Sequence, residues 1–172
     1  MKKRPQSGTD YSPQFEAYVS KMPEGELPDI LIEQSRETVN LFLGLTHEQA
    51  NHRYAPDKWS VKEVLGHMAD TERVMSYRLL RIARGDQTPL AGFEENLFVN
   101  GADFGRLSLE ELLQNYEAVR QATLTLIKGM PEEAWTRRGF ANGHEITAQA
   151  LAFIIAGHEL HHKQIVQERY LS

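Results

Sequence analysis

Residues 59–70 read WSVKEVLGHMAD, and they begin the longest helical pattern of the chain. Ser60 and Glu63 have the spacing of a capping box, in which each side chain accepts a hydrogen bond from the backbone N–H of the other residue. Apolar residues then recur every three or four positions until Gly85, which predicts the buried face of one long helix. The members of this stripe are Val61, Val64, Leu65, Met68, Met75, Leu79 and Ile82.

Three further segments have the same helical periodicity, at about 28–43, from Ser108 to Gly129, and at about 147–169. Ser108 and Glu111 form a second predicted capping box. Because no strand pattern is convincing, the sequence predicts an all-α four-helix bundle with a long crossover loop at 86–107. Connections of that length are unusual in compact domains and are often functional. We also expect a short helical turn inside this crossover loop.

The chain has a length of 172 residues, which suits one domain spanning residues 1–172. It shows no internal repeat and no linker. Residues 1–26 precede the first long helix and are expected to form a peripheral segment. Within that segment, residues 11–22 should pack on the outside of the bundle.

Composition excludes several classes of function. A net charge of −5 argues against binding of nucleic acid or anionic membranes, and Arg78, Arg81 and Arg84 read as one solvated or partner-binding helix face. The chain contains no cysteine, so thiolate ligands and a cysteine nucleophile are excluded. We find neither a signal peptide nor a run of about 18 apolar residues, and we expect a cytoplasmic protein.

The last helical segment carries three of the seven histidines, in the sequence GHELHHKQIV at 157–166. His158 and His162 lie one turn apart at the centre of its apolar stripe, where Leu or Ile is expected. Two buried imidazoles are costly unless their nitrogens find partners. Either each is a hydrogen-bonded core residue or the two converge on one metal ion, and the pattern leaves both open.

A metal site needs a third protein ligand, and His67 is the best candidate because it flanks the apolar stripe of its helix. His47 and His52 lie near an interhelical connection and are expected to be solvated. His144 precedes the last helix and could line a pocket. His161 lies at the edge of the stripe.

Two familiar metal sites fit poorly. His158–His162 matches the H-E-x-x-H spelling of zinc proteases, but no histidine follows it and no sheet is expected beside it. A di-iron carboxylate site needs two Glu-x-x-His pairs, whereas only Glu159 and His162 have that spacing, and Glu159 should point away from the stripe centre.

Several segments resemble those of one known family, the DinB/YfiT-like superfamily. Residues 59–70 (WSVKEVLGHMAD) resemble its second-helix signature, and residues 157–165 (GHELHHKQI) resemble its last-helix signature. Residues 46–50, 53–56 and 124–135 also fit, so that the resemblance spans about 27–168. It implies an up-down-down-up bundle, a divalent metal held by His67, His158 and His162, and a homodimer. It also implies a metal-dependent hydrolase or an S-transferase that uses a low-molecular-weight thiol.

Three imidazole ligands leave coordination positions open, as in catalytic metal sites. Nitrogen ligands suit Zn²⁺ or Ni²⁺, with Fe²⁺, Co²⁺ or Mn²⁺ as further candidates. Three functions therefore stay open, all on a small-molecule substrate or ligand: hydrolysis, transfer of an external thiol, and metal or ligand binding without catalysis. Proton transfer would use one of four weaker candidates: Glu159, Asp70, His161 or His144.

Overall fold

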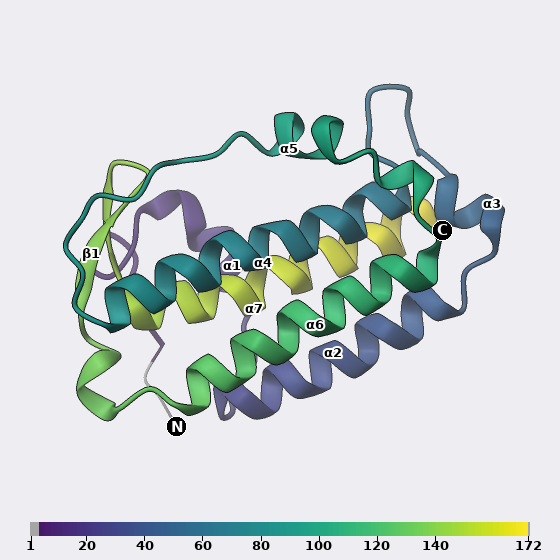
Figure 1. Cartoon of the computed structure of the whole chain (residues 1–172). Helices are drawn as coiled ribbons and strands as arrows, with labels where there is room; N and C mark the ends of the chain where they lie inside the picture. Colours follow the sequence, from purple (N-terminus) through teal and green to yellow (C-terminus); the bar gives the residue numbers. More distant parts are fainter. Residues whose placement is uncertain (1–3, 172) are drawn as a thin grey trace.

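The computed structural model describes residues 4–171 and confirms the predicted four-helix bundle. Its long helices are α2 (Leu27–Leu43), α4 (Val61–Ala83), α6 (Leu109–Lys128) and α7 (Ala148–Ile165). Helix α4 packs against α6 and α7, and α2 packs against the same two helices. The four helices therefore enclose one interior (Figure 1).

Both predicted capping boxes are present and fix where two helices begin. At α4, the backbone N–H of Ser60 donates to Glu63 Oε2 at 2.6 Å, and that of Glu63 donates to Ser60 Oγ at 3.3 Å. Ser108 and Glu111 repeat this arrangement at α6. A third box starts the short α3 (His47–Asn51). Gly85 follows α4 with a φ of +83°, a left-handed conformation that favours glycine and ends the helix.

The segment before the bundle folds onto α7. A 3₁₀ turn, η1 (Pro13–Phe15), leads into the short α1 (Glu16–Val19), which packs on α7 (Figure 1). Gly157 permits this approach, because a Cβ there would lie only 2.2 Å from the carbonyl oxygen of Tyr18. Helix α7 is thus covered on every side along its first two-thirds.

The crossover between α4 and α6 is not an unstructured loop. It contains α5 (Glu95–Ala102) and a 3₁₀ turn, η2 (Phe104–Arg106), and it runs along the bundle back to the start of α6 (Figure 1). Phe104 packs directly over Gly66, where a Cβ would lie 2.6 Å from its ring. The expected helical turn inside the crossover is therefore present, and the segment covers α4.

The expectation of no strands was wrong in one place. A 3₁₀ turn, η3 (Glu132–Ala134), is followed by a hairpin of β1 (Arg138–Ala141) and β2 (His144–Thr147). Asn142 and Gly143 form its turn, both with positive φ, as two-residue hairpins prefer. The strands are only four residues long, too short for alternation to stand out from the sequence.

The last helix differs in its final turn. After Ile165 the chain widens into a π-helix, η4 (Val166–Tyr170). The last helix was predicted to continue to about residue 169, and its final part is this π-helix. The hydroxyl of Tyr170 donates to the carbonyl oxygen of Trp59 at 2.7 Å and fastens this end to the start of α4. Within residues 4–171, no helix is long and apolar enough to cross a membrane.

Candidate metal centre

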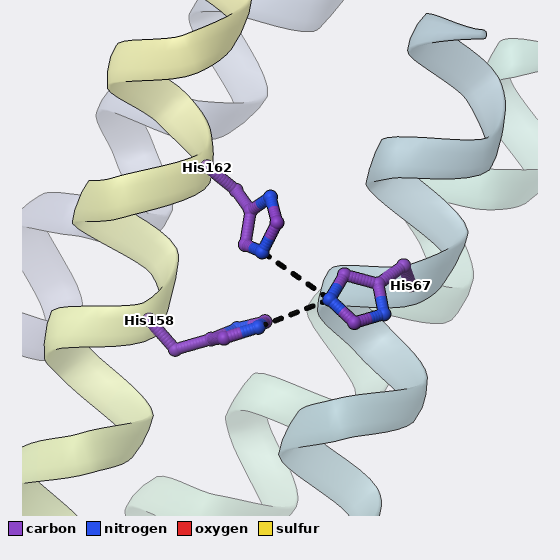
Figure 2. Close-up of side chains that lie close together, drawn as sticks. All are labelled: His67, His158 and His162. Atoms are coloured by element: carbon purple, nitrogen blue, oxygen red, sulfur yellow. Dashed lines mark hydrogen bonds between the residues drawn. The ribbon is translucent and has the colours of Figure 1, made fainter. Parts of the chain in front are cut away.

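Three histidines from two helices converge on one point between α4 and α7 (Figure 2). The Nε2 atom of His67 lies 3.1 Å from that of His158 and 3.2 Å from that of His162. All three rings thus present the same nitrogen to a common centre. The structure brings together the three residues that the sequence singled out.

These distances match the spacing that a metal ion imposes. Two imidazole nitrogens bound at 2.0–2.1 Å to a tetrahedral ion lie about 3.3 Å apart. If each ring carries its proton on Nδ1, all three Nε2 atoms are acceptors that face one another without a donor. The cluster therefore has the geometry and the donor set of a divalent-metal site.

Burial keeps these imidazoles neutral, as metal ligation requires. His67 is only 2% exposed and His158 only 5%. Burial lowers the pKa of His67 to about 4. Burial and the charges of neighbouring imidazoles lower the pKa of His162 to about 3 and that of His158 well below its usual range. At neutral pH all three nitrogens are available to a cation.

Neighbouring side chains orient the rings from both sides. Thr71 Oγ1 lies 3.4 Å from Nδ1 of His67, one turn along α4, where it can accept a hydrogen bond from Nδ1–H and so leave Nε2 unprotonated. The ring of Tyr18 meets His158 edge-on, with centroids 5.4 Å apart. The indole of Trp59 covers His67 at 4.6 Å. The cluster therefore has an aromatic wall on each side.

Two cavities open beside the cluster. One, of about 220 Å³, is lined by His158, Tyr18 and Thr71 together with residues of the crossover. The other, of about 240 Å³, is lined by His162, Trp59 and Tyr170. Each cavity therefore offers space for a small molecule next to one histidine of the cluster.

Glu159, one of the candidates for proton transfer, is buried on the other side of α7. It is 3% exposed and faces the bundle interior, away from the histidines. Thr38 donates to its Oε1 at 2.5 Å, and Tyr116 donates to the same oxygen. Arg120 Nη2 lies 2.5 Å from its Oε2. Glu159 does point away from the centre of the apolar stripe of α7, as expected. The side of α7 that carries it is also buried.

Arg120 joins Glu159 to a second buried carboxylate. Its Nε donates to Glu72 Oε1 at 2.9 Å and its Nη2 to Glu72 Oε2 at 2.6 Å, while Nη1 donates to the carbonyl oxygen of Leu31 at 3.1 Å. Burial opposes the charge on Arg120, but the carboxylates of Glu159 and Glu72 outweigh it and raise its pKa. We call Thr38, Glu72, Tyr116, Arg120 and Glu159 the interior ion network.

The other candidates for proton transfer lie apart from the three nitrogens. His161 is partly exposed and stacks edge-on against Tyr18, with centroids 5.3 Å apart. Asp70 pairs with Arg73 at 3.3 Å, and burial raises its pKa. His144 is exposed on β2, so the expectation that it lines a pocket is not met; Asn142 of the same hairpin lines the cavity instead. His47 and His52 are exposed, as expected.

Sequence reasoning gave no role at the site to four residues that contact the cluster or line its cavity: Thr71, Tyr18, Trp59 and Arg78. Thr71 lies one turn after His67 and could have been found from that spacing. Tyr18 and Trp59 arrive from segments outside the two ligand helices. The view of Arg78 as part of a solvated face was wrong, because it is 4% exposed and lines the cavity at His158.

Comparison with known proteins agrees with this geometry. A family model described as the DinB superfamily matches residues 30–166. The chain belongs to the DinB superfamily. This DinB protein is also 31% identical over 112 residues to a protein from Geobacillus thermodenitrificans that is named as a candidate metal-dependent hydrolase. That match covers 65% of the chain and 59% of the relative's length.

Solved structures show the same fold. YfiT from Bacillus subtilis, described as a candidate metal-dependent hydrolase with an unusual four-helix bundle topology, superposes with a TM-score of 0.75 at 16% identity, covering 86% of this DinB chain and 90% of YfiT. A mycothiol-dependent maleylpyruvate isomerase gives 0.67 at 13% identity, covering 84% and 61%. YjoA, a DinB-like protein from Bacillus subtilis, gives 0.60 at 17% identity, covering 83% and 87%. The family and the three-histidine cluster together support a divalent-metal site.

Proposed function

We propose that this DinB protein is a metal-dependent hydrolase of a small molecule, with His67, His158 and His162 as the ligands of one divalent ion. The observation that carries this proposal is the convergence of three neutral Nε2 atoms beside two cavities. Such a set leaves coordination positions open for a reactant, unlike a closed structural site. The names of the Geobacillus relative and of YfiT support the same reaction class.

The protein's own groups have defined tasks in this proposal. The three imidazoles hold the ion, which would supply Lewis-acid activation of a ligand atom. Thr71 keeps the proton of His67 on Nδ1, and the rings of Tyr18 and Trp59 pack against His158 and His67 and hold them in place. Nitrogen-only ligation favours Zn²⁺ or Ni²⁺ over Fe²⁺, Co²⁺ or Mn²⁺.

A panel of small esters and amides tests hydrolysis. Protein loaded with Zn²⁺ or Ni²⁺ should turn over at least one of them without any added thiol. The His162→Ala variant should lose this turnover, whereas His161→Ala, which removes the neighbouring imidazole, should retain it. Turnover that persists in His162→Ala would contradict the proposal.

Thiol transfer is the second candidate, because two cavities meet at one cluster from the sides of His158 and His162. Two ligands could thus approach one ion together. The chain has no cysteine, so the thiol would come from outside, and the mycothiol-dependent structural neighbour supports this class. Activity that appears only when a low-molecular-weight thiol is added would replace hydrolysis with transfer, and a cytoplasmic location would fit that need for a reduced thiol.

We also propose a homodimer, on the family resemblance. An apolar groove between α4 and α6, lined by Tyr77, Leu80 and Leu126 among others, offers a surface for a second copy. Light scattering on the purified protein should give twice the mass of one chain. A monomer at all concentrations would reject this assignment without affecting the metal centre.

A further inference from the structure

The cavity beside His158 contains a charged group that the metal centre does not use. Arg78 of α4 lines this cavity of about 220 Å³ together with Thr71 and Met75 of the same helix. His67, Thr71, Met75 and Arg78 follow one another at intervals of four, four and three, so they share one face of α4. Arg78 therefore lies at one end of the cavity and the three-histidine cluster lies at the other.

The position of the guanidinium is fixed. His67 and Arg78 are separated by three helical turns, about 16 Å along the axis, and helical side chains lean toward the N-terminus, which brings Arg78 back toward the cluster. Its Nη2 donates to the carbonyl oxygen of Ala91 at 2.6 Å. The ring of Phe93 packs against it, with Cζ 5.6 Å from the ring centroid. The crossover thus holds the group in place.

No carboxylate neutralises this guanidinium among residues 4–171. Arg73, Arg81 and Arg120 each lie within 4.0 Å of a carboxylate oxygen, whereas the remaining polar neighbour of Arg78 is Sδ of Met75 at 3.6 Å. The residue is only 4% exposed, and burial lowers its pKa. A buried charge without a counterion is costly, and a bound anion would remove that cost.

The rest of the lining limits which anion fits. Glu95 also lines the cavity, and burial together with the charge of Glu94 raises its pKa. A carboxyl group elsewhere in the lining disfavours a ligand with a high negative charge, such as a phosphate dianion, more than one with a single negative charge. Gln14 and Asn142 add amide groups, and Phe15 and Ile154 add apolar surface. The cavity has room for a short carbon chain between the two ends.

We propose that Arg78 is the binding site for a carboxylate of the substrate, whose reacting group lies a few bonds away at the three-histidine cluster. This inference rests on the proposed function for the identity of the reacting end, but the carboxylate site itself does not require the metal. The substrate class is therefore a small carboxylic acid that carries a second, reactive group.

The direct test follows the Nε–H signal of Arg78 by NMR in isotopically labelled native protein, assigned through bonds so that no variant is needed. Butyrate should shift this signal with half-saturation in the millimolar range, both in the metal-loaded and in the chelator-treated protein. Butyramide, which has nearly the same shape without the charge, should leave it in place. Methyl phosphate should shift it less than butyrate.

Each opposite result overturns the inference. The site is not a carboxylate site if butyrate produces no saturable shift or if butyramide produces an equal one. A shift confined to the metal-loaded protein would assign the carboxylate to the ion. A stronger response to methyl phosphate would reject the preference for a single charge. The chelator-treated protein tests the carboxylate site without the metal. Failure of this inference can therefore be distinguished from failure of the hydrolase proposal.

Kinetics provide a second readout where hydrolysis is observed. Arg78→Gln should raise KM for a half-ester of a short dicarboxylic acid by about tenfold or more, with a smaller change in kcat. KM for the corresponding neutral diester should stay nearly unchanged. Arg84→Gln, which removes an exposed charge from the end of the same helix, is the matched control and should change neither. Equal effects of Arg78→Gln on both esters would reject the inference.

Discussion

Two buried polar clusters lie next to each other in this bundle and are built on opposite principles. His158 belongs to the three-histidine cluster and Glu159, the next residue, belongs to the interior ion network. In the network, one guanidinium faces two carboxylates, and two hydroxyl groups supply further donors. In the histidine cluster, three nitrogens face one another without a cation from the protein.

The difference separates a group that holds the fold from a group that binds a ligand. The network takes residues from all four long helices, and each of its charged groups has an oppositely charged partner inside the protein. The histidine cluster takes residues from two helices and adjoins two cavities. A buried cluster whose polar groups all have partners within the protein is structural, whereas one whose polar groups lack a partner and adjoin a cavity is a candidate binding site. Arg120 also lines a cavity, but it is paired with two carboxylates, whereas Arg78 is paired with none among residues 4–171.

The largest effect is expected from breaking the network. Arg120→Met leaves Glu72 and Glu159 buried without a cation and should lower the free energy of unfolding by about 3–5 kcal/mol, measured in urea. Arg36→Met, which breaks an exposed i, i+3 pair with Glu33, is the control and should cost about 0.5 kcal/mol or less. If both variants cost the same, the network does not hold the bundle together.

The next effect is expected from the metal. A ligand present at 100 times its dissociation constant stabilises the folded state by about 2.7 kcal/mol. Addition of Zn²⁺ or Ni²⁺ to chelator-treated protein should therefore raise the urea midpoint, and His158→Ala should abolish the increase. Arg120→Met, although less stable, should keep it. An equal increase in His158→Ala would show that the ion binds elsewhere.

A smaller effect concerns pH in the metal-free protein. The pKa values of His67 and His162 fall to about 4 and about 3 in the folded state, so the unfolded chain binds more protons below about pH 6.5. These histidines therefore do not lower the free energy of unfolding above pH 6.5. As the solution is acidified toward their folded-state pKa values, the free energy of unfolding falls by up to about 1.4 kcal/mol per pH unit for each histidine.

Comparison with one variant isolates this contribution from that of the carboxylates. His67→Gln should show a shallower loss of unfolding free energy between pH 6.5 and 5, in protein treated with chelator, because its side chain no longer takes up a proton. The exposed His47→Gln should follow the native profile. Identical slopes for all three proteins would mean that protonation of the histidine cluster does not destabilise the folded state.

The smallest effect is expected at Thr71. Its hydroxyl lies 3.4 Å from Nδ1 of His67, a long contact, so Thr71→Val should weaken metal binding by about tenfold or less. The affinity can be measured by competition with a chromogenic chelator. Thr125→Val, on the exposed face of α6, should bind the metal as the native protein does. Unchanged affinity in Thr71→Val would remove Thr71 from the site.

The parts of this structure that sequence can predict are those that depend on one helix at a time. Capping boxes at Ser60 and Ser108 mark where α4 and α6 begin, and Gly85 marks where α4 ends. His158 and His162 stand out because they interrupt an apolar stripe one turn apart. The prediction of His67 as the third ligand depended on the assumption that its helix faces α7. The family resemblance also implied this ligand.

The remainder depends on which elements cover a helix, and periodicity does not reveal that. Glu159 and Arg78 each lie outside the positions expected to be buried, yet α6 covers one and the crossover covers the other. Tyr18 reaches His158 only because Gly157 lets the backbone of α1 approach α7. The hairpin at Asn142–Gly143 had its turn signal in the sequence, but its strands were too short to predict.

The metal content of protein purified without an affinity tag tests the central claim most directly. Elemental analysis should find close to one divalent ion per chain, and His158→Ala should lose it. His161→Ala, which removes the adjacent histidine that does not face the cluster, should retain it. Native metal content in His158→Ala, or its loss only in His161→Ala, would contradict the assignment of His67, His158 and His162 as the metal ligands.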